Sequence, residues 1–186
     1  VKEALASMIA VIGENMNIRR FEKLVAENGF ITSYIHGGGR IGILVEVETT
    51  AVNDEVKEAA KNVAMQIAAM YPKYIKREDV PQDFIDYEKN IIKAQIMNDP
   101  ANSKKPEHII EKMIEGRLNK ELKEMCLVDQ LYVKDSDMTV GQYLESVSKQ
   151  VGAPVSIKRF VRYETGEGLE KKSEDFAAEV AKQMGL

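Results

Sequence analysis

The chain has very little of several residue types, and each scarcity excludes a class of structure. Its 186 residues include one cysteine, Cys126, so an internal disulfide is excluded and a reduced cytoplasmic setting is expected. Only two histidines occur, His36 and His108, with no cysteine or carboxylate at ligand spacing, so we expect no metal and no cofactor. No apolar run approaches the roughly 20 residues of a membrane span, and no apolar leader is recognisable. We therefore expect no membrane association.

An excess of basic residues is also missing. Lysine and arginine number 26 against 30 acidic residues, a formal net charge of -4, whereas a nucleic-acid-binding face needs net positive charge. The basic and aromatic segment 158–163 is therefore interpreted as an ordinary strand, and no direct nucleic-acid partner is expected. With 44% hydrophobic and 30% charged residues, the composition is typical of a globular protein of one domain or two small lobes.

Two stretches of the chain repeat each other. Gly13 and the segment Ile18–Phe21 recur at identical spacing as Gly152 and Ile157–Phe160. Each glycine follows an apolar helical stretch and precedes a β-branched, basic segment, which predicts a helix–turn–strand unit twice. The predicted elements are a helix at 2–12 with a strand at 17–26, and a helix from Thr139 to Val151 with a strand at 154–164. Only the second unit has a partner hairpin within the chain, so the first is expected to be the tail of another unit.

That partner hairpin is predicted at residues 30–48. Strands at 30–36 and 40–48 alternate in polarity on either side of Gly37–Gly39, which is a strong hairpin signal. The core side of the second strand is predicted to carry Ile41, Ile43, Val45 and Val47. A phosphate-binding loop at Gly37–Arg40 is disfavoured, because such a loop leads into a helix and these glycines lead into a strand.

The remaining chain has helical periodicity. A helix is predicted from Asn53 to Met70, with an apolar stripe at Val56, Val63, Ile67 and Met70 and a stop at Pro72. Two charged helices at 82–98 and 106–125 flank a breaker segment at 99–103 and are expected to form an antiparallel helical hairpin. Their facing residues are predicted to be Ile85, Ile92 and Ile96 against Ile110, Ile114 and Leu118. A last amphipathic helix is predicted at 173–184.

No set of residues forms a catalytic constellation, so we do not expect an enzyme. Cys126 has no histidine nearby in sequence to act as a base, and it is interpreted as a packed, unreactive thiol. The acidic pairs Glu46/Glu48 and Asp135/Asp137 are interpreted as solvated surface, since nothing near them in sequence supplies the burial that a raised pKa requires.

Five segments together resemble the elongation factor Ts family. Residues 12–20 resemble its IGEN-x-x-x-RR segment, and residues 34–45 resemble its Y-x-HG-x-RIGVLV hairpin. The other similar segments are 64–69, 106–120 and 175–180, and the similarity extends nearly from end to end. The motifs are specific in combination, although each one alone is weak.

The resemblance implies an α+β fold in which a three-stranded antiparallel sheet packs on helices. An antiparallel coiled-coil helical hairpin is inserted, and a C-terminal helix follows. The implied domains are a remnant of a first core subdomain at 1–27, a second core subdomain at 28–168 with the hairpin at 82–126, and a C-terminal helical module at 169–186. The family's amino-terminal module and its TDF motif have no match in the chain.

The implied function is guanine-nucleotide exchange on elongation factor Tu during translation. The missing TDF motif implies a partial form with reduced activity, because in the family its Asp-Phe pair enters the partner's magnesium-side nucleotide site. An alternative from a different class is a structural module that homodimerises through the helical hairpin, if the isoleucine stripes at 85, 92, 110 and 114 are exposed.

The resemblance also implies residues that contact elongation factor Tu. Arg40, Ile41 and Gly42 correspond to the hairpin positions that touch its G domain, although Ile41 also suits a core position. Gln66 replaces a frequent histidine and is expected to face either the partner or solvent. The other implied contacts, for which packing within the chain is the alternative, are Tyr132 and Val133 and, on the tail helix, Phe176 and Val180.

Overall fold

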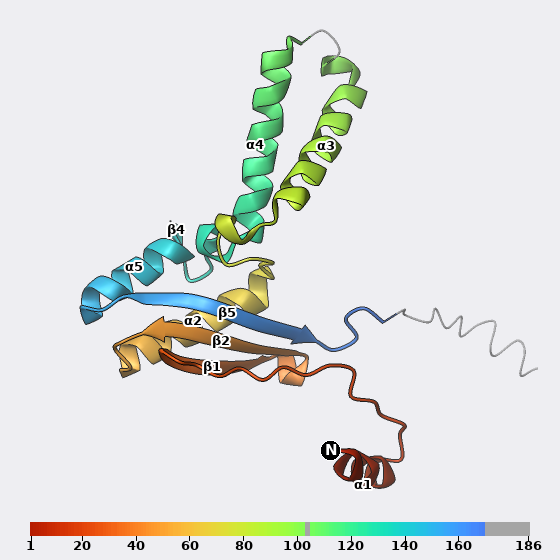
Figure 1. Cartoon of the computed structure of the whole chain (residues 1–186), viewed down its shortest axis with the longest axis vertical. Coiled ribbons are helices and arrows are strands. Elements are labelled where there is room, and N and C mark those ends of the chain that lie inside the picture. Colours follow the sequence, from red (N-terminus) through yellow and green to blue (C-terminus); the bar gives the residue numbers. More distant parts are fainter. Residues whose placement is uncertain (103–104, 170–186) are drawn as a thin grey trace, which may run out of the picture.

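A body of sheet and helices carries a projecting pair of helices in the computed structural model, which describes residues 1–102 and 105–169 (Figure 1). The α-helices of this part are α1 (Lys2–Ile12), α2 (Asp54–Met70), α3 (Gln82–Asn98), α4 (Glu107–Met125) and α5 (Val140–Val151). The strands are β1 (Gly29–His36), β2 (Ile41–Thr49), β3 (Leu131–Tyr132), β4 (Asp135–Thr139) and β5 (Val155–Glu164). Over the same residues, no helix combines the length and apolar character needed to cross a membrane.

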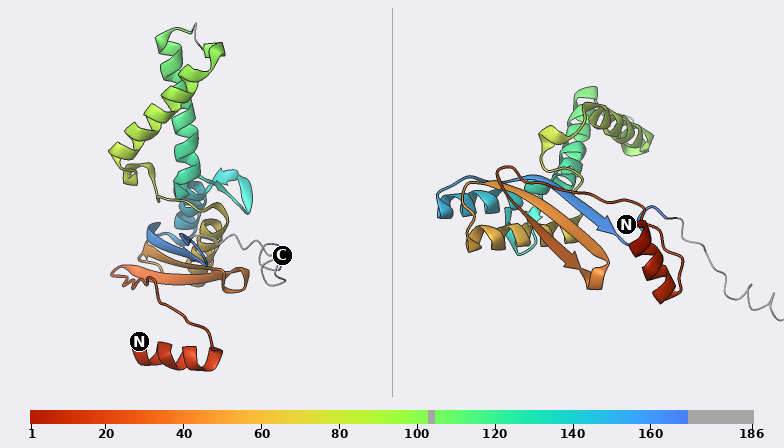
Figure 2. Two further views of the ribbon diagram at one scale, coloured as in Figure 1. Left: turned by 90° about the vertical axis from the view of Figure 1, so that its right-hand side faces the viewer. Right: turned by 60° about the horizontal axis from the view of Figure 1, so that its bottom comes forward.

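A three-stranded antiparallel sheet in the order β1-β2-β5 forms the centre of the body, as predicted. Ile43, Val45 and Val47 of the central strand β2 are at most 2% exposed, as predicted for its core side, whereas Ile41 at its start is only half-buried. These side chains pack against α2 and α5, which cover one side of the sheet (Figure 2). Burial of this apolar face is the main source of stability for the body.

Helix α2 has a clear start and a clear end. The Asn53 side chain caps it by accepting a hydrogen bond from the Val56 amide at 2.9 Å, and acidic residues occupy the first turn. The helix ends at Met70, and Tyr71 adopts a left-handed conformation with φ 48°. Met70 is 46% exposed, so its predicted place in the buried stripe is wrong, whereas Val56 and the other predicted stripe residues are buried.

Helices α3 and α4 run side by side away from the body and bury their apolar residues against each other (Figure 1). The buried members of this cluster are Val80, Ile92, Ile96, Ile114, Leu118, Leu122 and Cys126. The cluster contains the predicted facing residues, with Ile85 and Ile110 partly buried at its margin. The expectation of exposed isoleucine stripes is therefore wrong. No exposed isoleucine stripe of α3 or α4 supports homodimerisation through this pair.

Cys126 lies at the base of the helical pair. Its side chain is fully buried, as predicted, and desolvation raises the pKa of the thiol to about 11. The thiol therefore remains protonated at neutral pH, which is the unreactive form.

The segment between α4 and α5 is short but contains regular structure. A short 3₁₀ turn at Leu127–Asp129 precedes β3, which pairs with the unpredicted strand β4. The helix predicted from Thr139 is confirmed as α5, with Thr139 as its cap, and the side chains of Thr139 and Gln142 form a reciprocal capping box.

The predicted repeat is only half realised. Gly152 ends α5 with φ 69° and β5 follows, so the second helix–turn–strand unit is confirmed. Gly13 likewise ends α1 with φ 79°, but residues 13–28 contain no strand, and the strand predicted at 17–26 is wrong. A strand needs a neighbour for its backbone hydrogen bonds, and the three-stranded sheet contains only β1, β2 and β5, so residues 13–28 are not paired in it.

Glu46 differs most from its predicted environment. It lies on the central strand and is 1% exposed, not solvated, whereas Glu48 is exposed as predicted. The Arg159 guanidinium, directly across the sheet from Glu46, donates a hydrogen bond to its carboxylate, and the Lys158 ammonium lies 3.4 Å from it. These basic residues therefore neutralise a buried acid of their own chain.

The charge on Glu46 is expected to stabilise the fold. The Arg159 hydrogen bond holds the pKa of Glu46 below its ordinary value, so this stabilisation is present above the unfolded-state pKa of about 4.3. It is lost as the pH falls through the lower folded-state pKa. Glu46→Gln should therefore lower the urea midpoint of unfolding at pH 7, and the difference from the unmodified chain should shrink below about pH 4.

Exposed Glu48 on the same strand supplies the matched control, Glu48→Gln, which should leave the midpoint nearly unchanged. Equal midpoints for Glu46→Gln and the unmodified chain at pH 7 would contradict a stabilising role for the Glu46 charge.

Candidate functional site

The tip of the β1–β2 hairpin presents three of the predicted partner-binding residues. Gly37–Gly39 form a 3₁₀ turn that leads into β2, so the predicted turn is confirmed. Arg40 is exposed, and Ile41 and Gly42 are half-buried at the start of β2. Ile41 also packs at the edge of the core, so both predicted roles of its side chain fit this position.

A shallow apolar groove lies beside this tip on the side of the sheet away from α2. Its volume is about 340 Å³, and its lining includes Phe21, Ile35, Gly42, Leu44, Val161 and Tyr163. Phe21 is 82% exposed and Ile35 is 64% exposed. The tip is thus continuous with apolar surface that is open to solvent in the described part of the chain.

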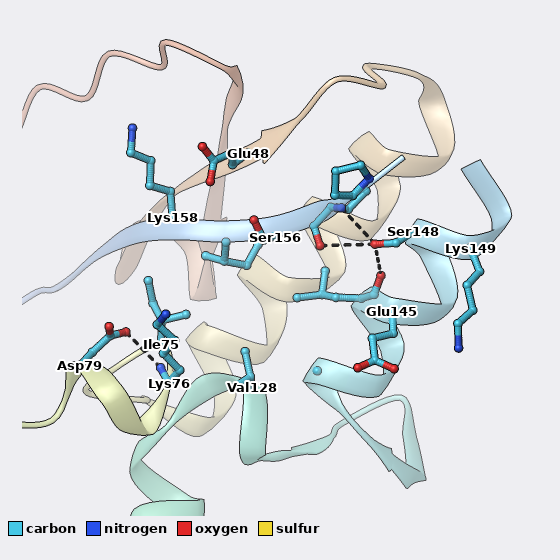
Figure 3. A pocket seen from close by; sticks show the side chains of 15 residues that line it. Glu48, Ile75, Lys76, Asp79, Val128, Glu145, Ser148, Lys149, Ser156 and Lys158 are labelled. Atoms are coloured by element: carbon cyan, nitrogen blue, oxygen red, sulfur yellow. Dashed lines mark hydrogen bonds between the residues drawn. The ribbon is translucent and has the colours of Figure 1, made fainter. Parts of the chain in front are cut away.

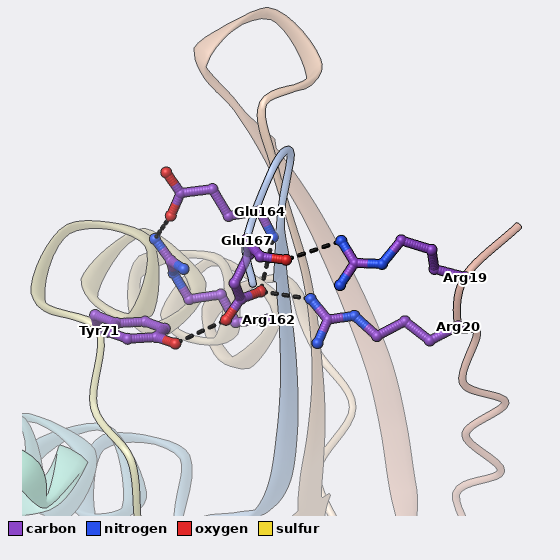
Figure 4. A network of polar contacts seen from close by, with 6 residues as sticks. All are labelled: Arg19, Arg20, Tyr71, Arg162, Glu164 and Glu167. Atoms are coloured by element: carbon purple, nitrogen blue, oxygen red, sulfur yellow. Dashed lines mark hydrogen bonds and ion pairs between the residues drawn. The ribbon is translucent and has the colours of Figure 1, made fainter. Parts of the chain in front are cut away.

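Six side chains from separate parts of the sequence meet next to the hairpin tip (Figure 4). We call this set the Glu167 junction, and its members are Arg19, Arg20, Tyr71, Arg162, Glu164 and Glu167. The Glu167 carboxylate accepts hydrogen bonds from the Tyr71 hydroxyl at 2.8 Å and from Arg20 Nη2 at 2.6 Å. Both contacts lower the pKa of Glu167, and the hydrogen bond from Tyr71 has the larger effect. The carboxylate is therefore ionised at neutral pH.

Aromatic rings hold the arginines of the junction in place. The Arg20 guanidinium lies 4.4 Å from the centroid of the Tyr163 ring, and that of Arg162 lies 4.2 Å from the Tyr71 ring. Arg162 also donates a hydrogen bond to Glu164 at 2.8 Å. The junction thus joins the end of α2, the end of β5 and the segment that follows α1.

Gln66 is fully buried on α2, facing neither solvent nor an open surface. Its Nε2 donates hydrogen bonds to Gln130 Oε1 at 3.1 Å and to the Leu131 carbonyl at 3.0 Å. Its Oε1 accepts a hydrogen bond from the Val133 amide at 2.8 Å. The Gln66 amide therefore fixes the backbone of the segment that contains β3.

Tyr132 and Val133 occupy this segment but differ in exposure. Tyr132 is 5% exposed, and its ring stacks on that of Tyr143 with centroids 4.3 Å apart. Burial raises the pKa of the Tyr132 hydroxyl. Val133 is 47% exposed and directs an apolar side chain outward. The segment thus combines a packed residue with one that is available for contact.

A larger groove of about 710 Å³ lies between α5, the start of β5 and the base of the helical pair (Figure 3). Ser148, which lines it, donates a hydrogen bond to the Leu144 carbonyl at 2.8 Å and accepts one from the Val155 amide at 3.0 Å. None of the predicted partner-binding residues of the described chain lines this groove. In residues 1–102 and 105–169, no group of three or more histidine, cysteine or acidic side chains is arranged to hold a metal ion.

The structure gathers the predicted residues into two sets. One is the hairpin tip of Arg40, Ile41 and Gly42, and the other is Gln66 with Tyr132 and Val133. Phe176 and Val180 lie outside the described residues. The Glu167 junction and the Gln66–Gln130 contact are not predicted from the sequence. The only sequence signal for the junction is the arginine pair, whose partner lies about 150 residues further along the chain.

Comparison with known proteins gives the same family as the sequence motifs. The family model described as elongation factor TS matches residues 1–167. The chain is 53% identical to elongation factor Ts of Clostridium novyi (strain NT) over 184 residues, which cover 99% of this chain and 59% of that protein. It is 50% identical to elongation factor Ts of Clostridium perfringens (strain SM101 / Type A) over 185 residues, which cover 100% of this chain and 60% of that protein.

The chain therefore spans about three fifths of the length of these curated relatives. The match nevertheless includes the sheet, the helical pair and the Glu167 junction, because all of them lie within residues 1–167. Agreement over this whole range, at half or more identical residues, shows that the chain belongs to the elongation factor Ts family.

Proposed function

We propose that this chain binds elongation factor Tu in the cytoplasm and promotes the release of its GDP during translation elongation. The family match over residues 1–167 is the observation that carries the proposal. Exchange of this kind makes and breaks no covalent bond, so the chain does not act as an enzyme. It must bind nucleotide-free Tu more tightly than GDP-bound Tu, and the coupling between the two ligands is reciprocal.

An extended contact surface suits this task. A nucleotide held at nanomolar strength represents about 12 kcal/mol of binding free energy, whereas one binding hot spot supplies only a few kcal/mol. We infer that Arg40, Ile41 and Gly42 contact the G domain of Tu and that Val133 contacts its third domain. The exposure of Arg40 and Val133 supports these assignments. Phe176 and Val180 are proposed as further contacts from the tail.

Gln66 and Tyr132 act in this proposal from within the chain. Both side chains are buried, so they serve the contact by shaping the segment that presents Val133. The hydrogen bond from the Val133 amide to Gln66 is the direct link.

The proposed division of the chain follows the resemblance. It assigns residues 1–27 to a first subdomain and residues 28–168 to a core subdomain with a coiled-coil hairpin at 82–126. The C-terminal module at 169–186, with its helix predicted at 173–184, lies outside the described residues apart from Leu169. The TDF motif has no counterpart, so we propose that the chain binds Tu but accelerates GDP release less than a longer relative does.

Release of fluorescently labelled GDP from elongation factor Tu tests the proposal directly. The chain should bind Tu at micromolar concentration and speed release, but by a smaller factor than the longer elongation factor Ts of Clostridium novyi assayed beside it. Absence of binding at micromolar concentration would discard the proposed function.

Ile41→Asp tests the hairpin tip. A buried charge at a partner contact should weaken Tu binding about tenfold or more, equivalent to at least 1.4 kcal/mol. Urea unfolding of the same variant separates this effect from loss of the fold. Met97→Asp, at a solvent-exposed position on α3 outside the proposed contact surface, is the control and should change binding less. An unfolded Ile41→Asp variant would assign Ile41 to the core instead.

Gln66→Leu tests the internal support of residues 130–133. The change leaves Gln130, the Leu131 carbonyl and the Val133 amide without their buried partner, which should cost about 2 kcal/mol or more in unfolding free energy. It should also weaken Tu binding. Gln95→Leu, at an exposed position on α3, is the control. Full stability of Gln66→Leu would show that this hydrogen-bond cluster contributes little.

A further inference from the structure

Arg19 and Arg20 have no place in the binding surface proposed above, yet both contact Glu167. Arg20 pairs with its carboxylate at 2.6 Å, and Arg19 Nη1 donates a hydrogen bond to its backbone carbonyl at 2.8 Å. The same carboxylate accepts a hydrogen bond from the hydroxyl of Tyr71, which follows the last residue of α2. One residue therefore connects two parts of the chain that are distant in sequence, and Figure 4 shows their side chains converging on it.

Glu167 also closes the turn that follows β5. Its amide donates a hydrogen bond to the Glu164 carbonyl at 3.2 Å, and its carboxylate accepts one from the Glu164 amide at 3.4 Å. Within this turn, the Thr165 amide donates to the Arg40 carbonyl at 2.9 Å, and Glu164 is paired with Ile41 across the sheet. The turn is thus bonded directly to the hairpin tip.

A second connection reaches the tip through Arg20. The guanidinium that pairs with Glu167 also covers the ring of Tyr163, and Tyr163 is the sheet partner of Gly42. Two routes therefore lead from the Glu167 carboxylate to the hairpin tip, one through the backbone of the turn and one through the Arg20 side chain.

We propose that Glu167 is a positioning residue for partner binding, which fixes the tip of the β1–β2 hairpin by joining Arg20 and Tyr71 across the 164–167 turn. The inference rests on the proposed function, because it concerns the same surface of Arg40, Ile41 and Gly42. Glu167 itself need not touch the partner. It acts by holding the tip in one arrangement before binding, so that less ordering is required when the complex forms.

The size of the effect follows from the number of contacts that share the carboxylate. The Arg20 and Glu167 side chains are 43% and 29% exposed, and a single ion pair at that exposure contributes little. Removing the charge weakens the pair and loosens the turn and the Tyr71 contact together. Coupling between sites of this kind typically changes affinity about fivefold or more, so we expect Glu167→Gln to bind Tu about fivefold to tenfold more weakly.

The test compares the unmodified chain with Glu167→Gln, Arg20→Gln and the double variant. Glu145→Gln, an equal charge change at an exposed position on α5, is the control. Amide hydrogen exchange of the free chain reports whether the 164–167 turn and the hairpin tip are held. Affinity for nucleotide-free elongation factor Tu reports whether that matters for binding.

Glu167→Gln and Arg20→Gln should each speed exchange at the turn and the tip and weaken binding. The affinity of the double variant for Tu should be no lower than that of the single variant with the lower affinity, because both changes break the same contact. The control should match the unmodified chain in both measurements.

Faster exchange with unchanged affinity would overturn the proposal, because the junction would then be only structural. Unchanged exchange would overturn it as well. Additive losses in the double variant would place Arg20 and Glu167 in independent roles and would also contradict it. Failure of the proposed function is distinguishable, since the unmodified chain would then fail to bind Tu, while hydrogen exchange would still report whether Glu167 holds the turn.

Discussion

The burial of one face of the central strand against two helices is the constraint on which the rest of the structure depends. Val45 and Val47 are fully buried, as are Val56 and Val63 of α2. Because this face fixes which side of β2 points to the core, it also fixes the register of β1 and β5 against β2 and the position of the tip that joins β1 to β2. The opposite side of the sheet is not covered by α2 and α5 and carries different groups. It carries the buried Glu46 carboxylate with its basic partners and, nearer the tip, the apolar groove.

Local patterns predict most of the fold correctly. Period-two alternation predicts β1 and β2, a capping asparagine and an apolar stripe predict α2, and breaker residues separate α3 from α4. The strand predicted at 17–26 fails for a physical reason, because β-branched residues create a strand only where another strand can pair with them. The predicted exposure of Glu46 and of Gln66 is wrong for a related reason. Nothing near either residue in the sequence reveals that Arg159 or the backbone of residues 131–133 will lie against it and satisfy its polar atoms.

In the candidate site too, some features can be predicted from neighbouring residues and others depend on contacts with residues distant in the sequence. The exposure of Arg40 follows from its place after the predicted glycine turn, whereas the sequence leaves partner contact and packing both open for Val133. The support behind them comes from residues far away in the sequence, namely Gln66 for Val133 and Glu167 for the hairpin tip. The residues proposed to bind a partner are therefore separate from those proposed to position them, and the second kind is recognised only from the hydrogen bonds of the folded chain.

The base of the helical pair has a consequence for how the molecule tolerates change. The amides of Lys73 and Tyr74 both donate to the Met125 carbonyl, and the Leu127 amide donates back to Tyr74. The chain thus leaves for the projecting helices and returns from them at adjacent points, and the apolar cluster within them is separate from that of the body. A change in the length of the helical pair therefore leaves the sheet uninterrupted. The pair can become longer or shorter without a change in the core of the body.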